Sequence, residues 1–347
     1  MRKSFALTIT LAATLFATES SAIRCHNVVF AVSAAKGDLA QVKKCIQERR
    51  DPNQIDDMGS RPIIQAARKG HTSIVQFLLK NGADPNKPDK SGDTAIQFAQ
   101  KKGKNYTIIT ALLMNYGANP NYVNSWGSTP LIDAVRNGLQ VNTILLLEHG
   151  KVKAKANIFV IKGQTPLWYA VRKGSSQATI VRILARNGAN MNNYDKFGLT
   201  PLMRAVDKGH IKIARALVQN KANPNLRSKQ KTQLTPLLLA VNADNNATKL
   251  IELLVQNGAD INKGNHWGYT PLMRAASLEK VEALRKLLLL GADESRRTKN
   301  GATALTYAKK TKNPEILKLL NIETTGDLEN ELLSLADETA QKLSRLR

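Results

Sequence analysis

A short phrase that returns at a fixed interval is the feature that most constrains this sequence. The residues GLTPLMRA (Gly198–Ala205) recur almost unchanged as GYTPLMRA (Gly268–Ala275), 70 positions later. The related phrase QLTPLLLA (Gln233–Ala240) lies midway, 35 positions from each. A period of this length is typical of chains built from one small structural unit repeated many times. The sequence therefore predicts an array of repeats.

The threonine of this phrase marks the start of a helix in each repeat. Threonine caps helices by accepting a hydrogen bond from an early backbone N–H, and proline is tolerated at the first helical position. Thr200 and Pro201 therefore open a helix, which Gly209 ends because glycine readily adopts a positive φ. The equivalent threonines follow one another at intervals of 33 to 36 residues: Thr94, Thr129, Thr165, Thr200, Thr235, Thr270 and Thr303.

A second helix follows the first in each repeat. After Gly209, four apolar residues recur at the spacing of one helix face: Ile211, Ala214, Leu217 and Val218. A tetrapeptide such as ADPN or ANPN comes next and predicts a turn into an exposed hairpin. One helix pair cannot bury its own apolar face, so neighbouring pairs are expected to stack into a continuous core.

These features resemble the ankyrin repeat, in which Thr-Pro-Leu opens a first helix, a second helix ends in Gly-Ala-Asp, and a hairpin leads onward. The resemblance extends from about Cys25 to Ile322. Eight repeats carry the signature in register, and a degenerate first repeat brings the number to about nine. The resemblance implies an all-α solenoid of helix–turn–helix–hairpin units. It also implies protein partners as a class and identifies none, because one fold hosts many functions.

The sequence departs from the family at the fourth residue of the phrase. In ankyrin repeats this residue is usually a histidine that helps to tie neighbouring repeats by hydrogen bonds. Here the position holds other residues: Ile64, Gln97, Ile132, Trp168, Met203, Leu238, Met273 and Thr306. We therefore expect these polar ties to be absent and cohesion to depend on apolar burial. We also expect Trp168 and Met203 to be substantially buried between repeats.

Some turns and hairpins are longer than the rest. The turn between the two helices is longer in alternate repeats, which suggests duplication of a two-repeat block. The hairpin from Lys151 to Gly163 is also long, and it combines an apolar run containing Phe159 with four lysines: Lys151, Lys153, Lys155 and Lys162. In one interpretation the lysines steer an acidic partner and Phe159 contacts it, since insertions at hairpins usually map to a binding face. In the other, the run folds back and extends the core.

The two ends of the chain do not follow the repeat. Residues 1–22 place Arg2 and Lys3 before an apolar run, Phe5–Phe16, and small residues after it, which is typical of a secretory signal peptide. A membrane-spanning helix takes about 20 apolar residues, more than this run or any later segment offers. Residues 23–322 are then the repeat domain of an exported protein, periplasmic or secreted. Residues 323–347 predict an amphipathic helix that caps the last repeat or, alternatively, binds a partner or self-associates.

No constellation of residues predicts catalysis. The five histidines fall in five different repeats, and the usual nucleotide-binding, metalloprotease and nucleophile motifs are missing. We therefore expect no enzyme activity, no cofactor and no metal site. The two cysteines, Cys25 and Cys45, lie near the start and the end of the first helix pair. An antiparallel pair brings these places together and export permits a disulfide, whereas a small apolar Cys45 in the core is the alternative.

The formal net charge of +24 at pH 7 is the most suggestive feature for function. In ankyrin repeats the first helices and the hairpins border one concave groove, and stacking places equivalent positions in rows. Basic residues at these positions, besides those of the long hairpin, predict a positive strip: Arg68, Lys69, Lys101, Lys102, Arg136, Arg172, Lys173, Lys208, Arg227, Lys229 and Lys231. A biased composition without function would explain the same charge.

The sequence thus predicts a non-catalytic, exported and monomeric scaffold that binds a protein through its basic concave face and hairpin tips. The alternative is adhesion to a polyanion, namely nucleic acid, an acidic glycan or an anionic membrane surface, through the same strip. The two differ in salt dependence, because polyanion binding weakens steeply as counterions compete.

Cleavage of the signal peptide is expected after Ala22, because small residues precede that bond. N-terminal sequencing of the soluble protein from a secreting host should therefore begin at Ile23. Recovery of mature, soluble protein that still carries Met1 would contradict this expectation.

Overall fold

The computed structural model describes residues 25–159 and 164–320, and it divides into two compact units. The first unit runs to residue 130 and includes residues 149–153, and the second holds residues 131–148 and those from 154 onward. The expected signal peptide (1–22), the C-terminal segment 323–347 and Lys162 lie outside the described residues. Within those described ranges, no helix combines the length and apolar character needed to cross a bilayer.

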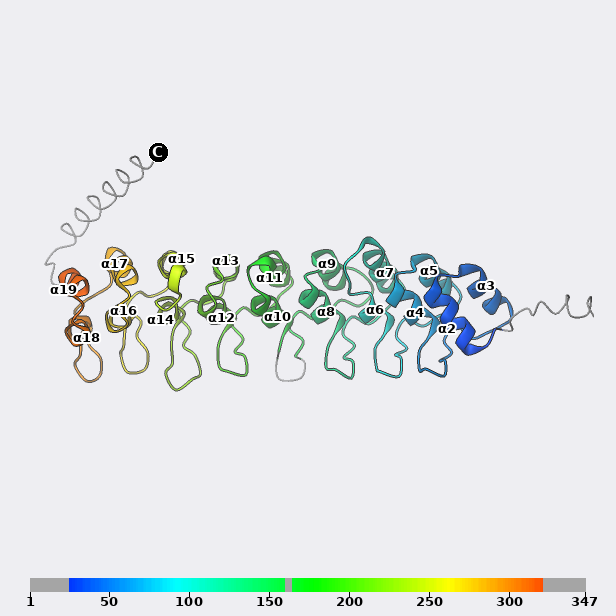
Figure 1. The fold of residues 1–347 in the computed structure, drawn as a ribbon, viewed down its shortest axis with the longest axis horizontal. Coiled ribbons are helices and arrows are strands. Elements are labelled where there is room, and N and C mark those ends of the chain that lie inside the picture. Colours follow the sequence, from blue (N-terminus) through cyan, green and yellow to red (C-terminus); the bar gives the residue numbers. More distant parts are fainter. Residues whose placement is uncertain (1–24, 160–163, 321–347) are drawn as a thin grey trace, which may run out of the picture. The chain divides into compact units, whose positions relative to one another are not determined.

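The first unit contains three helix pairs. These are α2 (Asn27–Lys36) with α3 (Leu39–Gln47), α4 (Pro62–Lys69) with α5 (Thr72–Lys80), and α6 (Ala95–Phe98) with α7 (Lys104–Asn115). The first helices α2, α4 and α6 pack in one row and the second helices α3, α5 and α7 in another. Figure 1 shows the hairpins of this unit on the side of the first helices.

The second unit repeats this arrangement six times. Its pairs are α8 (Pro130–Asn137) with α9 (Gln140–Glu148), α10 (Pro166–Lys173) with α11 (Ala178–Arg186), α12 (Pro201–Asp207) with α13 (Ile211–Gln219), α14 (Pro236–Ala240) with α15 (Ala247–Gln256), α16 (Pro271–Ser277) with α17 (Val281–Leu289), and α18 (Ala304–Thr311) with α19 (Pro314–Leu320). Here too the hairpins lie beside the first helices (Figure 1). The described residues thus contain nine helix pairs, which confirms the predicted all-α repeat architecture.

The repeated threonine caps the first helices as expected. Thr200 is extended, with φ −77° and ψ 162°, and its hydroxyl accepts a hydrogen bond from the N–H of Met203 at 3.3 Å. Thr270 makes the same bond to Met273. Each cap satisfies one backbone donor that the helix itself leaves open, which contributes about 1 kcal/mol. The repeated phrase therefore sets where each first helix begins.

Apolar burial between repeats forms the core. Met203 and Leu238, at the family's histidine position, are completely buried, so the expectation for Met203 is confirmed. Trp168 is only partly buried, because its ring borders a cavity described below. Fully burying a side chain of this size contributes roughly 1.5–3 kcal/mol, so the row of such positions stabilises the stack substantially.

The longer turns in alternate repeats are absorbed in two ways. In two repeats a short 3₁₀ turn precedes the second helix, namely Ser175–Gln177 before α11 and Asp244–Asn246 before α15. In a third repeat, α7 is lengthened to 12 residues. The additional residues are therefore taken up at the start of the second helices, and one of them, Gln177, is buried.

Asparagine side chains tie each hairpin to the next repeat within both units. Asn225 donates its Nδ2 to the carbonyl of Gly258 at 2.7 Å, and its Oδ1 accepts from the N–H of Asp260 at 2.8 Å. Asn53, Asn86 and Asn157 make the same pair of bonds. We call the set the asparagine ladder, and it comprises Asn53, Asn86, Asn121, Asn157, Asn192, Asn225 and Asn262.

The asparagine ladder corrects one expectation from the sequence. Polar ties between repeats are present, and they come mainly from the last residue of the turn tetrapeptide. At the fourth position of the repeated phrase, Gln97 also donates its Nε2 to the carbonyl of Ser128 in the next repeat at 3.3 Å. Except at Asn157, an Asp or Asn two positions earlier holds the ladder asparagine in place, as when Asn223 Oδ1 accepts from the N–H of Asn225 at 2.8 Å. Such turns form because short Asn and Asp side chains readily accept from backbone two residues on.

Glycine at the end of a first helix also allows contact between repeats. Gly37 has φ +85°, and a Cβ placed on it would lie 2.8 Å from Cε1 of His71 in the next repeat. His71 Nε2 in turn lies 2.9 Å from the carbonyl oxygen of Ala35. In the second unit, the ring of His210 packs on Gly174 in the same way. These two histidines are the N-cap residues of the second helices α5 and α13.

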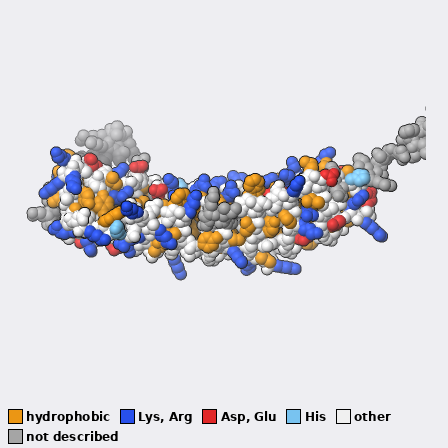
Figure 2. Space-filling model, turned by 90° about the horizontal axis from the view of Figure 1, so that it is seen from below, with side chains coloured by type: hydrophobic (Ala, Val, Ile, Leu, Met, Phe, Trp, Pro, Cys, Tyr) orange, Lys and Arg blue, Asp and Glu red, His pale blue; other side chains and the backbone are white. Residues whose placement is uncertain are grey.

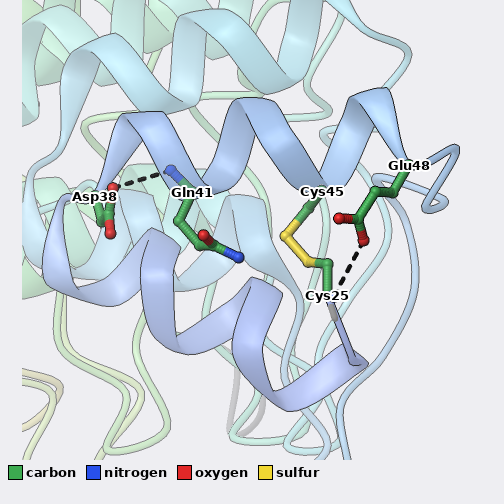
Figure 3. Close-up of a disulfide and its surroundings, with 5 residues drawn as sticks. All are labelled: Cys25, Asp38, Gln41, Cys45 and Glu48. Atoms are coloured by element: carbon green, nitrogen blue, oxygen red, sulfur yellow. Dashed lines mark hydrogen bonds between the residues drawn. A yellow bond between two sulfur atoms is a disulfide. The ribbon is translucent and has the colours of Figure 1, made fainter. Parts of the chain in front are cut away.

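Cys25 and Cys45 are joined by a disulfide that ties the segment before α2 to the end of α3 (Figure 3). Their Cα atoms lie 5.2 Å apart, and both side chains are buried. The N–H of Cys25 donates to the Glu48 carboxylate at 3.1 Å, while Asp38 caps α3 by accepting from the N–H of Gln41. Such a bridge restricts the unfolded chain and typically contributes about 2–4 kcal/mol.

Removal of one asparagine of the ladder should destabilise the second unit. We expect Asn225→Ala to lower the free energy of unfolding by about 1–2 kcal/mol, because two hydrogen bonds are lost at a site where water partly replaces them. Denaturant titration measures the change. Asn300→Ala, at an exposed hairpin position outside the ladder, should leave stability within about 0.5 kcal/mol of wild type. Equal effects of the two substitutions would contradict a structural role for the ladder.

Candidate ligand-binding cavities

Two cavities lie between first helices and hairpins of the second unit. The Arg204 cavity, of about 560 Å³, is lined by Gln164, Thr165, Trp168, Val171, Arg172, Asn193, Tyr194, Asp195, Lys196, Phe197, Leu199, Pro201, Arg204, Lys208 and His210. The Arg274 cavity, of about 840 Å³, is lined by Thr232, Leu234, Asn265, Trp267, Tyr269, Arg274, Thr298, Lys299, Asn300, Gly301, Ala302, Thr306, Tyr307 and Lys310. Both volumes fall in the range of ligand sites.

Asp195 organises the hairpin wall of the Arg204 cavity. Its Oδ1 accepts from the N–H of Phe197 at 2.8 Å and from the N–H of Leu199 at 3.1 Å. Its Oδ2 accepts from Arg204 Nε at 2.7 Å, and only 4% of the Asp195 side chain is exposed. A nearly buried carboxylate is stable there because a cation and two backbone donors satisfy it.

Aromatic rings in the Arg204 cavity are paired with cations. Arg204 Cζ and Lys196 Nζ each lie 4.7 Å from the centroid of the Phe197 ring. Arg172 Cζ lies 5.2 Å from the Trp168 ring, which is four residues earlier on the same face of α10. Cation–π attraction holds these long side chains in one arrangement at the cavity wall.

The Arg204 cavity is cationic overall. Its lining includes four basic side chains, Arg172, Lys196, Arg204 and Lys208, and one acidic side chain, Asp195. The ion pair with Arg204 neutralises Asp195, and Lys208 has only an exposed pair with the neighbouring Asp207 at 3.5 Å. Exposed pairs contribute little, so the cavity retains an excess of positive charge.

The Arg274 cavity has the same framework with one decisive difference. Asn265 stands where the earlier hairpin has Asp195, and its Oδ1 accepts from the N–H groups of Trp267 and Tyr269 at 3.0 and 3.1 Å. Arg274 occupies the repeat position of Arg204, 70 residues later. Within the described residues, no carboxylate lies within ion-pair distance of Arg274, and its buried Nε has no hydrogen-bond acceptor.

The surroundings of Arg274 are apolar enough to affect its charge. Burial lowers the pKa of Arg274 below its usual value, since the cation loses water. Burial also raises the pKa of Tyr269, whose hydroxyl hydrogen-bonds Ser277 and whose ring meets Tyr307 edge-on at 5.1 Å. The phenol of Tyr269 therefore stays neutral at physiological pH and does not supply a counter-charge to Arg274.

Several residues of the predicted positive strip do line cavities. Arg172 and Lys208 border the Arg204 cavity, and Arg136, Arg172 and Lys173 border a polar recess of about 610 Å³ beside Tyr169. Lys173 Nζ donates to the carbonyl of Arg136 at the end of α8. In the first unit, Lys101 makes the equivalent bond to Arg68 at the end of α4. Cations at the C-terminal ends of helices are stabilising, so these two lysines have a structural role as well.

The remaining predicted residues are divided between the units. Arg227 donates to the carbonyl of Gly264, and Lys229 lies 4.6 Å from the ring of Tyr194. Three further side chains of the second unit are exposed: Lys155, Phe159 and Lys231. Lys151 and Lys153, exposed as well, belong to the first unit. The exposed fraction of Phe159 is 59%, so this side chain does not extend the core.

Exposed apolar residues at hairpin tips were missed in the sequence. Four of them directly precede the tip glycine: Met58 and Trp126 in the first unit, and Phe197 and Trp267 in the second. Their exposed fractions are 82%, 78%, 51% and 38%. Figure 2, a view onto the hairpin side, shows hydrophobic patches among many Lys and Arg and few Asp and Glu side chains. Comparison of the repeats at this position alone would have revealed the pattern.

Metal-ligating side chains do not gather in the described part of the chain. No group of three or more His, Cys, Asp or Glu side chains there is placed to hold a metal ion. The groups that do converge are aromatic rings and cations, which suit recognition of an anionic or apolar ligand.

A family model described as "Ankyrin repeats (3 copies)" matches overlapping segments that together extend from residue 29 to 329. Ankyrin repeat protein nuc-2 of Neurospora crassa is 27% identical over 295 residues, which are 84% of this chain and 24% of that protein.

Two shorter matches are similar in kind. Mouse ankyrin repeat family A protein 2 is 36% identical over 70 residues, 20% of this chain and 22% of the relative. Human NAD-capped RNA hydrolase NUDT12 is 38% identical over 71 residues, 20% of this chain and 15% of the relative. The chain thus spans about a quarter or less of each of these proteins.

The difference between the two cavities predicts that replacing the arginine by methionine changes the free energy of unfolding differently at the two positions. Arg204→Met should lower the free energy of unfolding by about 2 kcal/mol, because it leaves the buried Asp195 carboxylate without its cation. Arg274→Met should change stability by less than about 0.5 kcal/mol or increase it, because an uncompensated cation is removed. Urea titration of both variants measures the difference. Similar losses in the two would show that Arg274 has an anionic partner within the chain.

Proposed function

The chain belongs to the ankyrin repeat family, and on this premise we propose that it is an exported, non-catalytic scaffold that binds a protein partner. Ankyrin repeats generally serve as protein-interaction scaffolds. The proposed binding surface comprises the hairpin tips and the two cavities of the second unit. The proposed partner carries acidic groups, because the exposed side chains of this surface are predominantly basic.

The observation that carries the proposal is the exposure of Phe197 and Trp267 among cations. Apolar residues at hairpin tips do not help the repeats to pack, and yet 51% and 38% of these two side chains are exposed. Aromatic residues and arginine are enriched at protein interfaces, whereas lysine and acidic residues are depleted there. Binding to a polyanion by charge alone would not require aromatic side chains at the tips.

The proposal of export has separate support. Residues 1–22 have the order of basic, apolar and small residues that is typical of a secretory signal. The disulfide between Cys25 and Cys45 suits an oxidising compartment, since disulfides are rare in the cytosol. Periplasmic and secreted locations agree equally well with both observations.

Site-specific photocrosslinking tests the proposed surface. A photoreactive amino acid is placed at Phe197 in the full chain, and, as a matched control, at Arg215, an exposed residue of α13. The periplasmic and secreted fractions of the source cells are then each irradiated with each variant. We expect a discrete protein adduct at position 197 and none at position 215.

Salt dependence distinguishes a protein partner from a polyanion. A polyanion contacted through six or more phosphates would lose about a thousandfold in affinity between 50 and 200 mM salt. The yield of the protein adduct at position 197 should fall far less, because apolar contacts are not screened. Adducts containing nucleic acid or glycan, or equal labelling at both positions, would contradict the proposal.

A further inference from the structure

The Arg204 and Arg274 cavities lie at equivalent places in two copies of the two-repeat block, 70 residues apart, and a carboxylate present in the first is missing from the second. In the earlier copy, Asp195 Oδ2 pairs with Arg204 Nε at 2.7 Å. In the later copy, Asn265 stands at the position of Asp195, and Arg274 stands at the position of Arg204. The hairpin backbone is held alike in both, since Asp195 Oδ1 and Asn265 Oδ1 each accept from the residues two and four positions on. The replacement therefore removes a counter-ion and leaves the hairpin framework unchanged.

Asn265 does not replace the missing acceptor. Its Oδ1 is engaged by two backbone N–H groups, and the amide nitrogen that remains is a donor, as is Arg274 Nε. Arg274 Nε is accordingly buried without an acceptor among the described residues. The Arg274 guanidinium therefore lacks, among the described residues, the counter-ion that Asp195 gives to Arg204, and a carboxylate that enters the cavity would supply one.

The cavity around Arg274 also has the charge and shape for a bound anion. Its lining contains three cations, Arg274, Lys299 and Lys310, and no Asp or Glu side chain. Trp267 and Tyr307 contribute aromatic surface, and Lys310 Nζ lies 5.7 Å from the Tyr307 ring. A carboxylate directed at Arg274 thus finds cations around it and apolar surface for the group that carries it.

We propose that the Arg274 cavity binds a carboxylate side chain of a partner protein, which supplies to the Arg274 guanidinium the counter-charge that Asp195 supplies to Arg204. The recognised segment contains Asp or Glu next to an apolar residue, which packs on Trp267 and Tyr307. This inference rests on the proposed scaffold function and specifies the partner. A peptide is favoured over a nucleic acid because the equivalent arginine, Arg204, already binds a carboxylate, that of Asp195 on the neighbouring hairpin.

Selection from a displayed library of random peptides tests the inference with the full chain. Peptides are selected on the wild-type protein and then measured against Asn265→Asp, which installs the missing carboxylate in a framework that already accepts an Asp at position 195. We expect the selected peptides to carry an acidic residue beside an apolar one. Asn265→Asp should weaken their binding by more than about tenfold, because the new carboxylate occupies Arg274.

Two controls separate this effect from net charge and from misfolding. Gln219→Glu adds the same charge on the exposed side of α13 and should change binding by less than about twofold, since it lies outside the cavity. The unfolding midpoint of Asn265→Asp should equal or exceed that of wild type. Arg274→Gln should weaken binding as much as Asn265→Asp does.

Three results would overturn the inference. The first is selected peptides without acidic enrichment, and the second is acidic peptides that bind Asn265→Asp as tightly as wild type. The third is displacement of the peptides by a single-stranded oligonucleotide whose binding also requires Arg274 and falls steeply with salt, which would identify nucleic acid as the ligand. A protein adduct at Phe197 with either of the first two results leaves the scaffold function intact, whereas absence of that adduct refutes the scaffold itself.

Discussion

Hydrogen bonds from asparagine side chains to the backbone of the next repeat fix the placement of the hairpins in each unit. Asn225 both donates to Gly258 and accepts from Asp260, so one side chain sets the distance and the register between two hairpins. Apolar packing of the helices is less directional and tolerates small shifts. The asparagine ladder therefore fixes where the hairpins stand, and the cavities between hairpins and first helices depend on that placement.

The two cavities show how a duplicated framework acquires different chemistry at one position. Both hairpins are closed by a side-chain oxygen that accepts two backbone N–H groups, a role that Asp and Asn perform equally well. Only Asp195 has a second oxygen able to accept from an arginine, and it satisfies Arg204 within the chain. Asn265 has an amide nitrogen instead, so Arg274 has no counter-ion among the residues that the structure describes. The physical difference is therefore one acceptor atom.

The basic residues serve more than one purpose. Lys101 and Lys173 bind carbonyl groups at the ends of first helices, and Arg227 binds the carbonyl of Gly264. Around Lys101, burial and the nearby Arg68 and Lys69 lower the pKa of the ammonium group, which shows that like charges are crowded there. Part of the predicted strip thus stabilises the repeats, while Arg172 and Lys208 face a cavity open to a ligand.

The sequence by itself determined the repeat, the helix pairs and their caps, because these follow from contacts within a few residues, such as Thr200 with Met203. It also placed Cys25 near the start and Cys45 near the end of one antiparallel helix pair, where the two positions lie close together. The tertiary structure decided the contacts between residues about 30 positions apart, such as the hydrogen bonds of the asparagine ladder. It also left one side of the Trp168 ring exposed. It likewise decided that Asp195 meets Arg204, since that contact requires a folded hairpin over α12. Periodicity fixes which residues share a row, but only folded geometry determines which atoms within a row come into contact.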